Sequence, residues 1–233
     1  MLRIRDLECR YGRIPVLKGV SITVANESVG LFGPNGAGKT TLINAIMGFI
    51  RPRAGVIEVD GRDLTRLKTH EIARIGIALV PQERELFPGM SVADNLELGA
   101  AYIPHARDNM EMQRAVVLGL FPILKERYRQ LVGTMSGGQQ RMVAIARALM
   151  ANPRLLILDE PSLGLQPSIV SEVFEKLMQL KARVSILVTE QNVRESLRAV
   201  DRGYVLENGA VALEDGAAGL SNNPHVIRSY LGI

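Results

Sequence analysis

The fold of this chain is decided by a glycine-rich stretch, Gly33-Pro34-Asn35-Gly36-Ala37-Gly38-Lys39-Thr40. The stretch matches the pattern G-x-x-x-x-G-K-[ST] at every position, follows an apolar segment at 29–32 and precedes residues with helical apolar spacing. Glycines let successive backbone N–H groups turn toward phosphate oxygens, and the beginning of a helix adds positive potential there. The stretch therefore predicts a strand, a phosphate-binding loop and a helix, in that order.

The loop assigns a role to its polar residues. Lys39 is expected to reach the β- and γ-phosphates of a nucleotide, and the Thr40 hydroxyl is expected to coordinate Mg²⁺. The alternative is a glycine-rich turn that holds no ligand. Such loops are shared by ATPases, GTPases and kinases of small molecules, so the loop alone does not identify the reaction. The expected nucleotide-binding residues of this region are Gly33, Asn35, Gly36, Gly38, Lys39, Thr40 and Thr41.

Outward from the loop, strand patterns alternate with helical ones. The helix after the loop is predicted over 41–49, with Phe49 on its buried face. Buried strands alternating with helices favour an α/β fold with a mixed, mainly parallel sheet. The strand patterns occupy 2–9, 20–24, 29–32, 56–59, 76–80, 155–158 and 185–188, and a hairpin pattern follows at 204–213.

The same patterns predict how the chain is divided. The first strands form an N-terminal antiparallel β subdomain, and an almost wholly helical stretch is inserted between core strands. We therefore expect a single domain over 1–233. In it, 1–85 and 151–233 form the core with the β subdomain, and 86–150 form an α-helical subdomain.

Composition excludes several classes of protein. Of 233 residues 47% are hydrophobic and 22% charged, the balance of a folded chain, and one cysteine excludes an internal disulfide framework. The net charge of +4 is spread along the chain without aromatic interleaving, so we expect no nucleic-acid partner. No stretch approaches the roughly 18 apolar residues of a membrane span, and we expect a chain that does not enter the bilayer.

An acidic pair follows the apolar strand pattern at 155–158. A buried strand in a parallel sheet delivers its last residues to the ligand-binding edge. There Asp159 is expected to hold Mg²⁺, and Glu160 to act as the general base that polarises the attacking water. The alternative is a pair of solvated carboxylates that cap the next helix.

The stretch Met135-Ser136-Gly137-Gly138-Gln139 precedes an amphipathic helical pattern. With the loop and the acidic pair at their spacing, it resembles the nucleotide-binding subunit of ABC transporters, whose signature reads LSGGQ. The resemblance extends over the whole chain and implies a P-loop ATPase core that binds ATP and Mg²⁺. It also implies a head-to-tail pair with a second ATPase subunit, identical or different. The residues that would bind that partner's ATP are Ser136, Gly137, Gly138 and Gln139.

Further positions take their roles from this resemblance. Tyr11 matches the aromatic residue that stacks on adenine, and Gln82 matches the glutamine that senses Mg²⁺ and the γ-phosphate. Gln191 stands at the family's switch histidine, where it can still donate a hydrogen bond but carries no positive charge. Gln166 replaces the aspartate that usually ends the loop after the acidic pair. The catalytic residues implied are thus Glu160, Gln82 and Gln191.

The segments Glu190-Gln191-Asn192 and 201–209 resemble the shorter ATPase subunit of branched-chain amino acid importers. Gln82 is closer to the related urea or amide importers, and lipopolysaccharide exporters share every nucleotide motif. A soluble ABC ATPase of DNA repair or translation is a further alternative. The importer resemblance implies integral membrane permease subunits, an external solute-binding protein acting indirectly, and a cytoplasmic position at the inner face of the membrane.

One surface is predicted for the permease. Phe87, Pro88 and Met90 are apolar residues close to Gln82 in the sequence, and the resemblance implies that they line a groove for a cytoplasmic helix of the permease. The alternative is that they pack inside the helical region.

Overall fold

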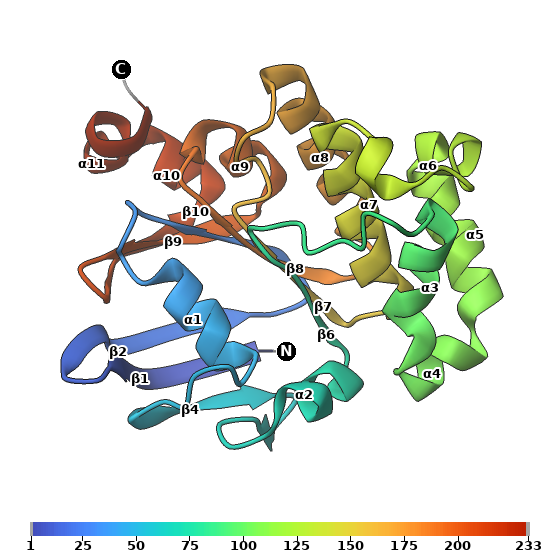
Figure 1. Cartoon of the computed structure of the whole chain (residues 1–233). Helices are drawn as coiled ribbons and strands as arrows, with labels where there is room; N and C mark the ends of the chain where they lie inside the picture. Colours follow the sequence, from blue (N-terminus) through green and yellow to red (C-terminus); the bar gives the residue numbers. More distant parts are fainter. Residues whose placement is uncertain (1, 232–233) are drawn as a thin grey trace.

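The molecule is built on two β-sheets joined by helices, and the computed structural model describes residues 2–231 of the chain (Figure 1). The limits of the predicted domain at residues 1 and 233 lie outside the described part. The first sheet is antiparallel, with the order β2-β1-β4-β5. Its strands are β1 (Leu2–Tyr11), β2 (Ile14–Val24), β4 (Ala54–Val59) and β5 (Arg62–Asp63).

Six strands form the second sheet, in the order β10-β9-β3-β8-β7-β6. The pairs from β9 to β6 are parallel, and β10 is antiparallel to β9. Every residue of β3 and β7 is buried, as expected for strands covered on both faces. The strands are β3 (Ser28–Phe32), β6 (Ile77–Val80), β7 (Leu155–Asp159), β8 (Ser185–Glu190), β9 (Arg202–Glu207) and β10 (Ala210–Gly216). The predicted α/β fold with a mixed, mainly parallel sheet is confirmed.

The helices fall into two groups. Those between β6 and β7 gather beyond one edge of the large sheet, on the right of Figure 1. They are α3 (Val92–Ala101), α4 (Pro104–Asp108), α5 (Met110–Leu120), α6 (Pro122–Glu126), the turn η1 (Val132–Thr134) and α7 (Gly137–Met150). The others are α1 (Lys39–Ile46), α2 (Thr69–Ile75), α8 (Pro167–Leu180), α9 (Val193–Ala199), α10 (Ala217–Asn222), α11 (Pro224–Val226) and the last turn η2 (Ile227–Leu231).

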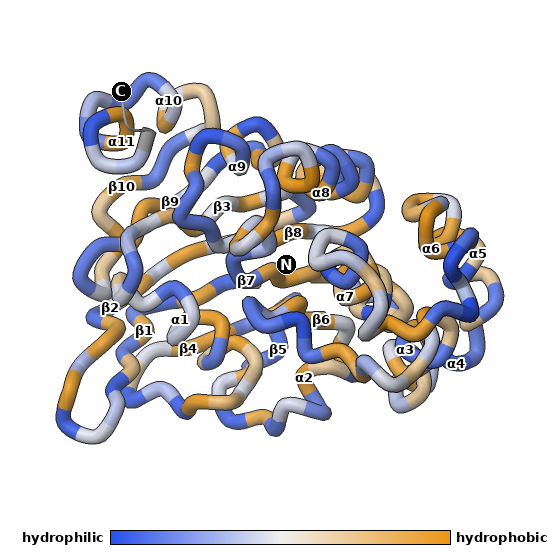
Figure 2. The backbone as a smooth tube through the Cα atoms, turned by 45° about the horizontal axis from the view of Figure 1, so that its top comes forward, coloured by the Kyte–Doolittle hydropathy of each residue, from blue (hydrophilic) through white to orange (hydrophobic). Residues whose placement is uncertain are grey.

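Two apolar clusters lie on the two sides of the large sheet. One joins the antiparallel sheet and α1 to the central strands, and the other joins those strands to α3, α7, α8 and α9. Figure 2 shows the hydrophobic residues running along β7 and β8 and the hydrophilic ones on outer turns. The central strands therefore have buried neighbours on both faces, which holds their carboxyl ends in place.

The helix after the loop is shorter than its pattern predicts. Helix α1 ends at Ile46, because Gly48 adopts the left-handed backbone (φ 73°) that typically ends a helix. Phe49 therefore leaves the helix, and its side chain is 57% exposed instead of buried. The prediction that Phe49 contributes to the core is wrong, and the residue belongs to a groove described below.

Strand order determines where the polar segments meet. The phosphate loop follows β3, and Gln191 follows β8. Asp159 ends β7 with Glu160 directly after it, and Gln82 follows β6. These four strands are parallel neighbours, so their carboxyl ends lie side by side at one edge of the sheet.

Candidate functional site

The phosphate loop leaves β3 through backbone that only glycine can adopt here. Gly33 has a φ of 147°, and a Cβ on it would lie 2.2 Å from the carbonyl oxygen of Leu206 in β9. Gly38 has a φ of 110°, and its Cβ would lie 2.7 Å from a methyl carbon of Leu17 in β2. The loop is thus pressed against both sheets, which brings its backbone N–H groups to the edge of the large sheet.

Lys39 and Glu160 face each other at the centre of this edge. The Lys39 ammonium donates to the carbonyl oxygen of Gly33 at 2.7 Å and lies 3.2 Å from Oε1 of Glu160. The Lys39 side chain is 4% exposed and that of Glu160 9%. A buried ion pair is stable only when further hydrogen bonds complete it, and the loop carbonyl supplies one.

Glu160 stands on strained backbone. Its φ is 44°, in the left-handed region that costs a side-chain-bearing residue about 1–2 kcal/mol. Its backbone N–H is held by the carbonyl and hydroxyl oxygens of Thr189, each at 3.1 Å. Strain of this kind persists where the surrounding structure enforces it and is concentrated at functional sites.

The three predicted Mg²⁺ ligands gather at one cavity. Thr40, Gln82 and Asp159 all line the groove between the large sheet and the helical group. Asp159 is buried, and one of its oxygens accepts a hydrogen bond from the Thr189 hydroxyl at 2.6 Å. A hydroxyl, an amide carbonyl and a carboxylate are oxygen donors of the kind Mg²⁺ prefers, so the residues present fit this ion.

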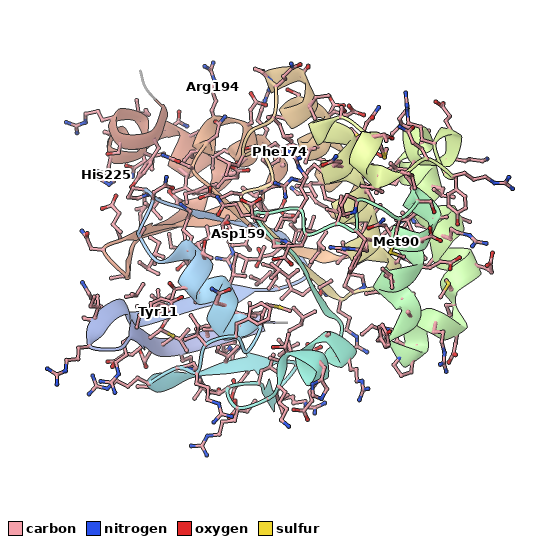
Figure 3. The ribbon with its side chains drawn as sticks, in the orientation of Figure 1. Tyr11, Met90, Asp159, Phe174, Arg194 and His225 are labelled. Atoms are coloured by element: carbon pink, nitrogen blue, oxygen red, sulfur yellow. The ribbon has the colours of Figure 1, made fainter. Side chains whose placement is uncertain are left out.

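A cavity of about 470 Å³ joins most of the predicted nucleotide-binding residues. Tyr11 is 51% exposed at its rim, and Figure 3 shows it at the end of β1, with Asp159 near the centre of the molecule. Gly33 is not among the lining residues, because it faces Leu206. The lining residues are Tyr11, Val16, Pro34, Asn35, Gly36, Gly38, Lys39, Thr40, Thr41, Gln82, Glu160 and Leu163.

The signature residues lie apart from this cavity. None of the residues 136–139 lines it. Ser136 caps helix α7, where its hydroxyl accepts from the backbone N–H of Gln139 at 3.3 Å, and the Gln139 side chain accepts from the Ser136 N–H at 3.1 Å. Gly138 packs closely, since a Cβ on it would lie 2.6 Å from Ile169, and a Cβ on Gly137 would lie 3.0 Å from the Arg84 guanidinium. The chain therefore presents two separate candidate nucleotide surfaces.

Gln191 is at the correct edge of the sheet but not in the cavity. It follows β8, between the loop after β3 and the acidic pair after β7, and its side chain is exposed. It does not line the cavity.

Two buried charged residues of the site have no counterpart among the predicted ones. The carboxylate of Glu190, the last residue of β8, accepts from the N–H and the hydroxyl of Ser162, each at 2.8 Å. Burial raises the pKa of Glu190 to about 6. Arg141 of α7 donates to the carbonyl oxygens of Pro81 and Gln82 at 2.9 and 2.8 Å. A carboxylate at the end of an apolar strand parallel to β7 was the available signal for Glu190, while nothing in the sequence indicates the contacts of Arg141.

The groove beside the site has a volume of about 800 Å³ and an apolar wall that includes Phe49, Phe87 and Tyr102. Pro88 and Met90 do not line it, contrary to prediction. Their carbonyl oxygens accept from the N–H groups of residues 133 and 132, so the chain turns away from the groove after Phe87. Figure 3 accordingly shows Met90 among the helices.

The sequence of the chain is similar to those of known transport ATPases. Residues 17–163 match the family model described as ABC transporter. The chain is 44% identical to a high-affinity branched-chain amino acid transport ATP-binding protein, BraG of Pseudomonas aeruginosa, with 100% of each chain covered. It is 38% identical to LptB, the lipopolysaccharide export system ATP-binding protein of Acidithiobacillus ferridurans, with 100% of this chain and 97% of the relative covered.

Solved structures agree with this fold over 93% or more of the chain. The ADP conformation of MJ1267, an ATP-binding cassette of an ABC transporter, has a TM-score of 0.88 at 29% identity and covers 100% of this chain and 99% of its own. A dimeric bacterial ABC transporter cassette, MJ0796, has a TM-score of 0.81 at 25% identity, with 93% and 99% covered. Within residues 2–231 no helix has the length and apolar character needed to cross a membrane. By sequence and by fold, the chain belongs to the ABC transporter family, as one of its ATP-binding ATPase cassettes.

Proposed function

We propose that this ATPase hydrolyses Mg²⁺-bound ATP with Glu160 as general base and powers uptake of branched-chain amino acids through separate membrane subunits. The observation that supports the chemistry is the 3.2 Å approach of Lys39 and Glu160 beside the phosphate loop. The Lys39 ammonium is suited to binding the γ-phosphate, and the Glu160 carboxylate is suited to accepting a proton from the water that attacks it. The two groups needed for hydrolysis are therefore close together.

Each side chain of the site has a proposed task. The loop N–H groups and Lys39 bind the β- and γ-phosphates, while Tyr11 at the rim stacks on adenine. Thr40, Gln82 and Asp159 hold Mg²⁺, which neutralises charge on the phosphate oxygens when bound. Glu160 orients the attacking water and accepts its proton. All the side chains given these roles line the nucleotide cavity or the adjoining groove.

Gln191 is proposed to donate a hydrogen bond to a γ-phosphate oxygen. Its position between the loop and the acidic pair supports this role, since β8 separates β3 from β7 in the sheet. A neutral amide stabilises developing negative charge less than a cation does, so hydrolysis is expected to be slower than with a protonated histidine at the same position.

The signature is proposed to act on the ATP of a second cassette. The separation of residues 136–139 from the cavity supports this, as does the likeness to a dimeric cassette. In a head-to-tail pair each ATP would lie between one phosphate loop and the partner's Ser136, Gly137, Gly138 and Gln139. The partner is a second copy or a related ATPase subunit, and Gln166 in place of the usual aspartate changes the contacts between them.

The groove at Phe49, Phe87 and Tyr102 is proposed to receive a cytoplasmic helix of the permease. Exposed aromatic residues in a concave surface mark a protein-binding site. The helical residues 86–150 are proposed to form a subdomain that connects this groove to the signature. The chain would then work at the inner face of the membrane, and a solute-binding protein would act on it only through the permease.

The likeness to BraG, a branched-chain amino acid transport ATP-binding protein, supports branched-chain amino acids as the solute, and urea or amides are close alternatives. Lipopolysaccharide export is a second candidate, favoured by the 38% identity to LptB over nearly the whole of both chains. Reconstitution with a permease of each class separates the two: labelled leucine accumulates in import, whereas lipopolysaccharide is extracted in export.

The catalytic assignment is tested with Glu160→Gln. This change keeps the shape of the side chain and removes the base, so ATP hydrolysis is expected to fall by about 100-fold or more while ATP binding persists. Phosphate release and binding of a fluorescent ATP analogue give the two readouts. Glu175→Gln, on the exposed face of α8, is the matched control and should hydrolyse ATP at the wild-type rate. Hydrolysis that is unchanged in Glu160→Gln would remove Glu160 from this role.

A further inference from the structure

We infer that Glu190 is a positioning residue for hydrolysis: its carboxylate fixes the turn at residues 160–162 and thereby holds Glu160 against the phosphate loop. The inference rests on the proposed role of Glu160. Glu190 does not line the nucleotide cavity, so it acts through the residues that it holds.

The contacts of Glu190 are bidentate. Its Oε1 accepts from the backbone N–H of Ser162 at 2.8 Å, and its Oε2 accepts from the Ser162 hydroxyl at 2.8 Å. The backbone N–H of Asn192 also donates to this carboxylate. One side chain thus connects the turn after β7 with the loop after β8 that carries Gln191.

The end of β8 holds the acidic turn at successive points. Thr189 accepts from the backbone N–H of Glu160 and donates to the carboxylate of Asp159. Glu190 then holds Ser162, two residues further along the turn. Since Glu160 has the left-handed φ of 44°, its conformation needs restraint on both sides. Thr189 supplies the first restraint and Glu190 the second.

Burial shows that this carboxylate is not merely a surface group that happens to meet Ser162. Glu190 is 2% exposed, and among residues 2–231 no Lys or Arg nitrogen lies within 4.0 Å of its oxygens. Its charged neighbours are Glu160, which follows β7, and Arg141 on α7, and Glu160 is itself paired with Lys39. A buried carboxylate with no ion pair costs stability, so a purely structural role would be filled more stably by a neutral side chain.

The geometry also explains why an amide holds this turn less firmly than the acid. The carboxylate accepts from the N–H and the hydroxyl of Ser162 and from the N–H of Asn192. A glutamine accepts through one oxygen only, so the Ser162 hydroxyl would have to turn and accept from its NH₂ group, and the remaining hydrogen bonds would lose the negative charge that strengthens them. Glu190→Gln therefore loosens the turn at 160–162 without removing much volume.

The test is a double-mutant cycle on the full-length chain at saturating Mg²⁺-ATP. Glu190→Gln and Ser162→Ala are each expected to lower kcat by about 10-fold or more, with KM for ATP changed by less than about 3-fold, because a displaced base slows chemistry without weakening nucleotide binding. The double variant is expected to be no slower than the slower single variant, because both changes break the same contact. Ser162→Thr keeps the hydroxyl and is expected to restore kcat.

Three outcomes would overturn the inference: unchanged kcat in Glu190→Gln, effects that multiply in the double variant, or a KM that rises as much as kcat falls. Thermal unfolding and ATP binding check that each variant folds. If Glu190→Gln does not fold, Ser162→Ala against Ser162→Thr decides the question. Glu160→Gln is assayed in parallel. If Glu160→Gln loses hydrolysis while Glu190→Gln keeps it, the proposed function stands and only the inference about Glu190 is rejected.

Discussion

Glu160 has a left-handed backbone conformation and a buried carboxylate, and one oxygen of this carboxylate lies 3.2 Å from the Lys39 ammonium. Each of these features is costly by itself, and they are maintained together by Lys39, Thr189 and the sheet edge beneath them. At the residue scale, the conformation and burial of Glu160 therefore lower the stability of the fold at the proposed catalytic site. The same holds for Glu190, a buried carboxylate beside another.

The burial of Glu190 predicts a pH-dependent stability difference. Because burial raises its pKa from 4.5 to about 6, the folded chain binds a proton more readily than the unfolded chain between these values. Stability from this group is present below the unfolded pKa and is lost as pH rises through about 6. Between about pH 7.5 and about pH 5, the free energy of unfolding of the wild type is expected to gain about 1 kcal/mol relative to Glu190→Gln.

Urea unfolding of both proteins at the two pH values measures this gain. Carboxyl groups whose pKa is lowered, such as Asp201 and Glu27, weaken the fold on acidification, but they do so in both proteins and cancel in the difference. A difference that stays constant with pH would show that Glu190 titrates as an ordinary carboxyl group.

Helix α7 shows how one element serves two purposes. Its N-cap Ser136 forms a capping box with Gln139, and its middle residue Arg141 holds the carbonyl oxygens of Pro81 and Gln82. Arg147 donates to the carbonyl oxygen of Glu85 at 2.8 Å. The helix that begins at the signature is therefore bonded directly to the segment that carries Gln82 and borders the groove.

The role proposed for Ser136 at a partner's ATP, added to its role as a helix cap, predicts that its loss has two separable effects. Ser136→Ala is expected to cost about 1 kcal/mol of stability through the lost cap, and also to lower ATP hydrolysis through the lost contact with the partner's ATP. Ser91 is a matched control, because it caps α3 with the same capping-box geometry, with Asp94 in place of Gln139. Ser91→Ala is expected to lose similar stability and keep its activity. Equal hydrolysis by the two variants would reduce Ser136 to a helix cap.

At the scale of the whole molecule, the nucleotide cavity and the apolar groove share Thr40 and Gln82 in their walls. A ligand in one cavity therefore touches residues that a ligand in the other also touches. If the groove binds a permease helix as proposed, this shared wall would connect that helix with the bound nucleotide.

The proposed role of the groove predicts which surface substitution weakens association of the ATPase with the permease. Phe87→Asp places a charge among Phe49 and Tyr102 and is expected to reduce co-purification with the permease by about 10-fold or more, since a central aromatic anchor is lost. The isolated chain should keep its ATP binding. Met112→Asp on α5 replaces another exposed apolar residue, outside the groove, and serves as the control. Permease association that survives Phe87→Asp would place the docking surface elsewhere.

By itself, the sequence determined the class of fold and identified the loop and the acidic pair as candidate site segments, because these depend on local patterns: apolar strands, glycines at fixed spacing and residues that directly follow a strand. It missed the early end of α1, where Gly48 adopts left-handed backbone, and so placed Phe49 in the core.

Only the tertiary structure decided which strand ends become neighbours. The order β3-β8-β7-β6 sets Glu160 against Lys39 and places Ser162 on Glu190, although about 120 residues separate the first pair in the chain and 28 the second. Tertiary structure also separated the signature from the loop and turned Pro88 and Met90 away from the groove. Such contacts join residues distant in sequence, and no periodicity within one segment can record them.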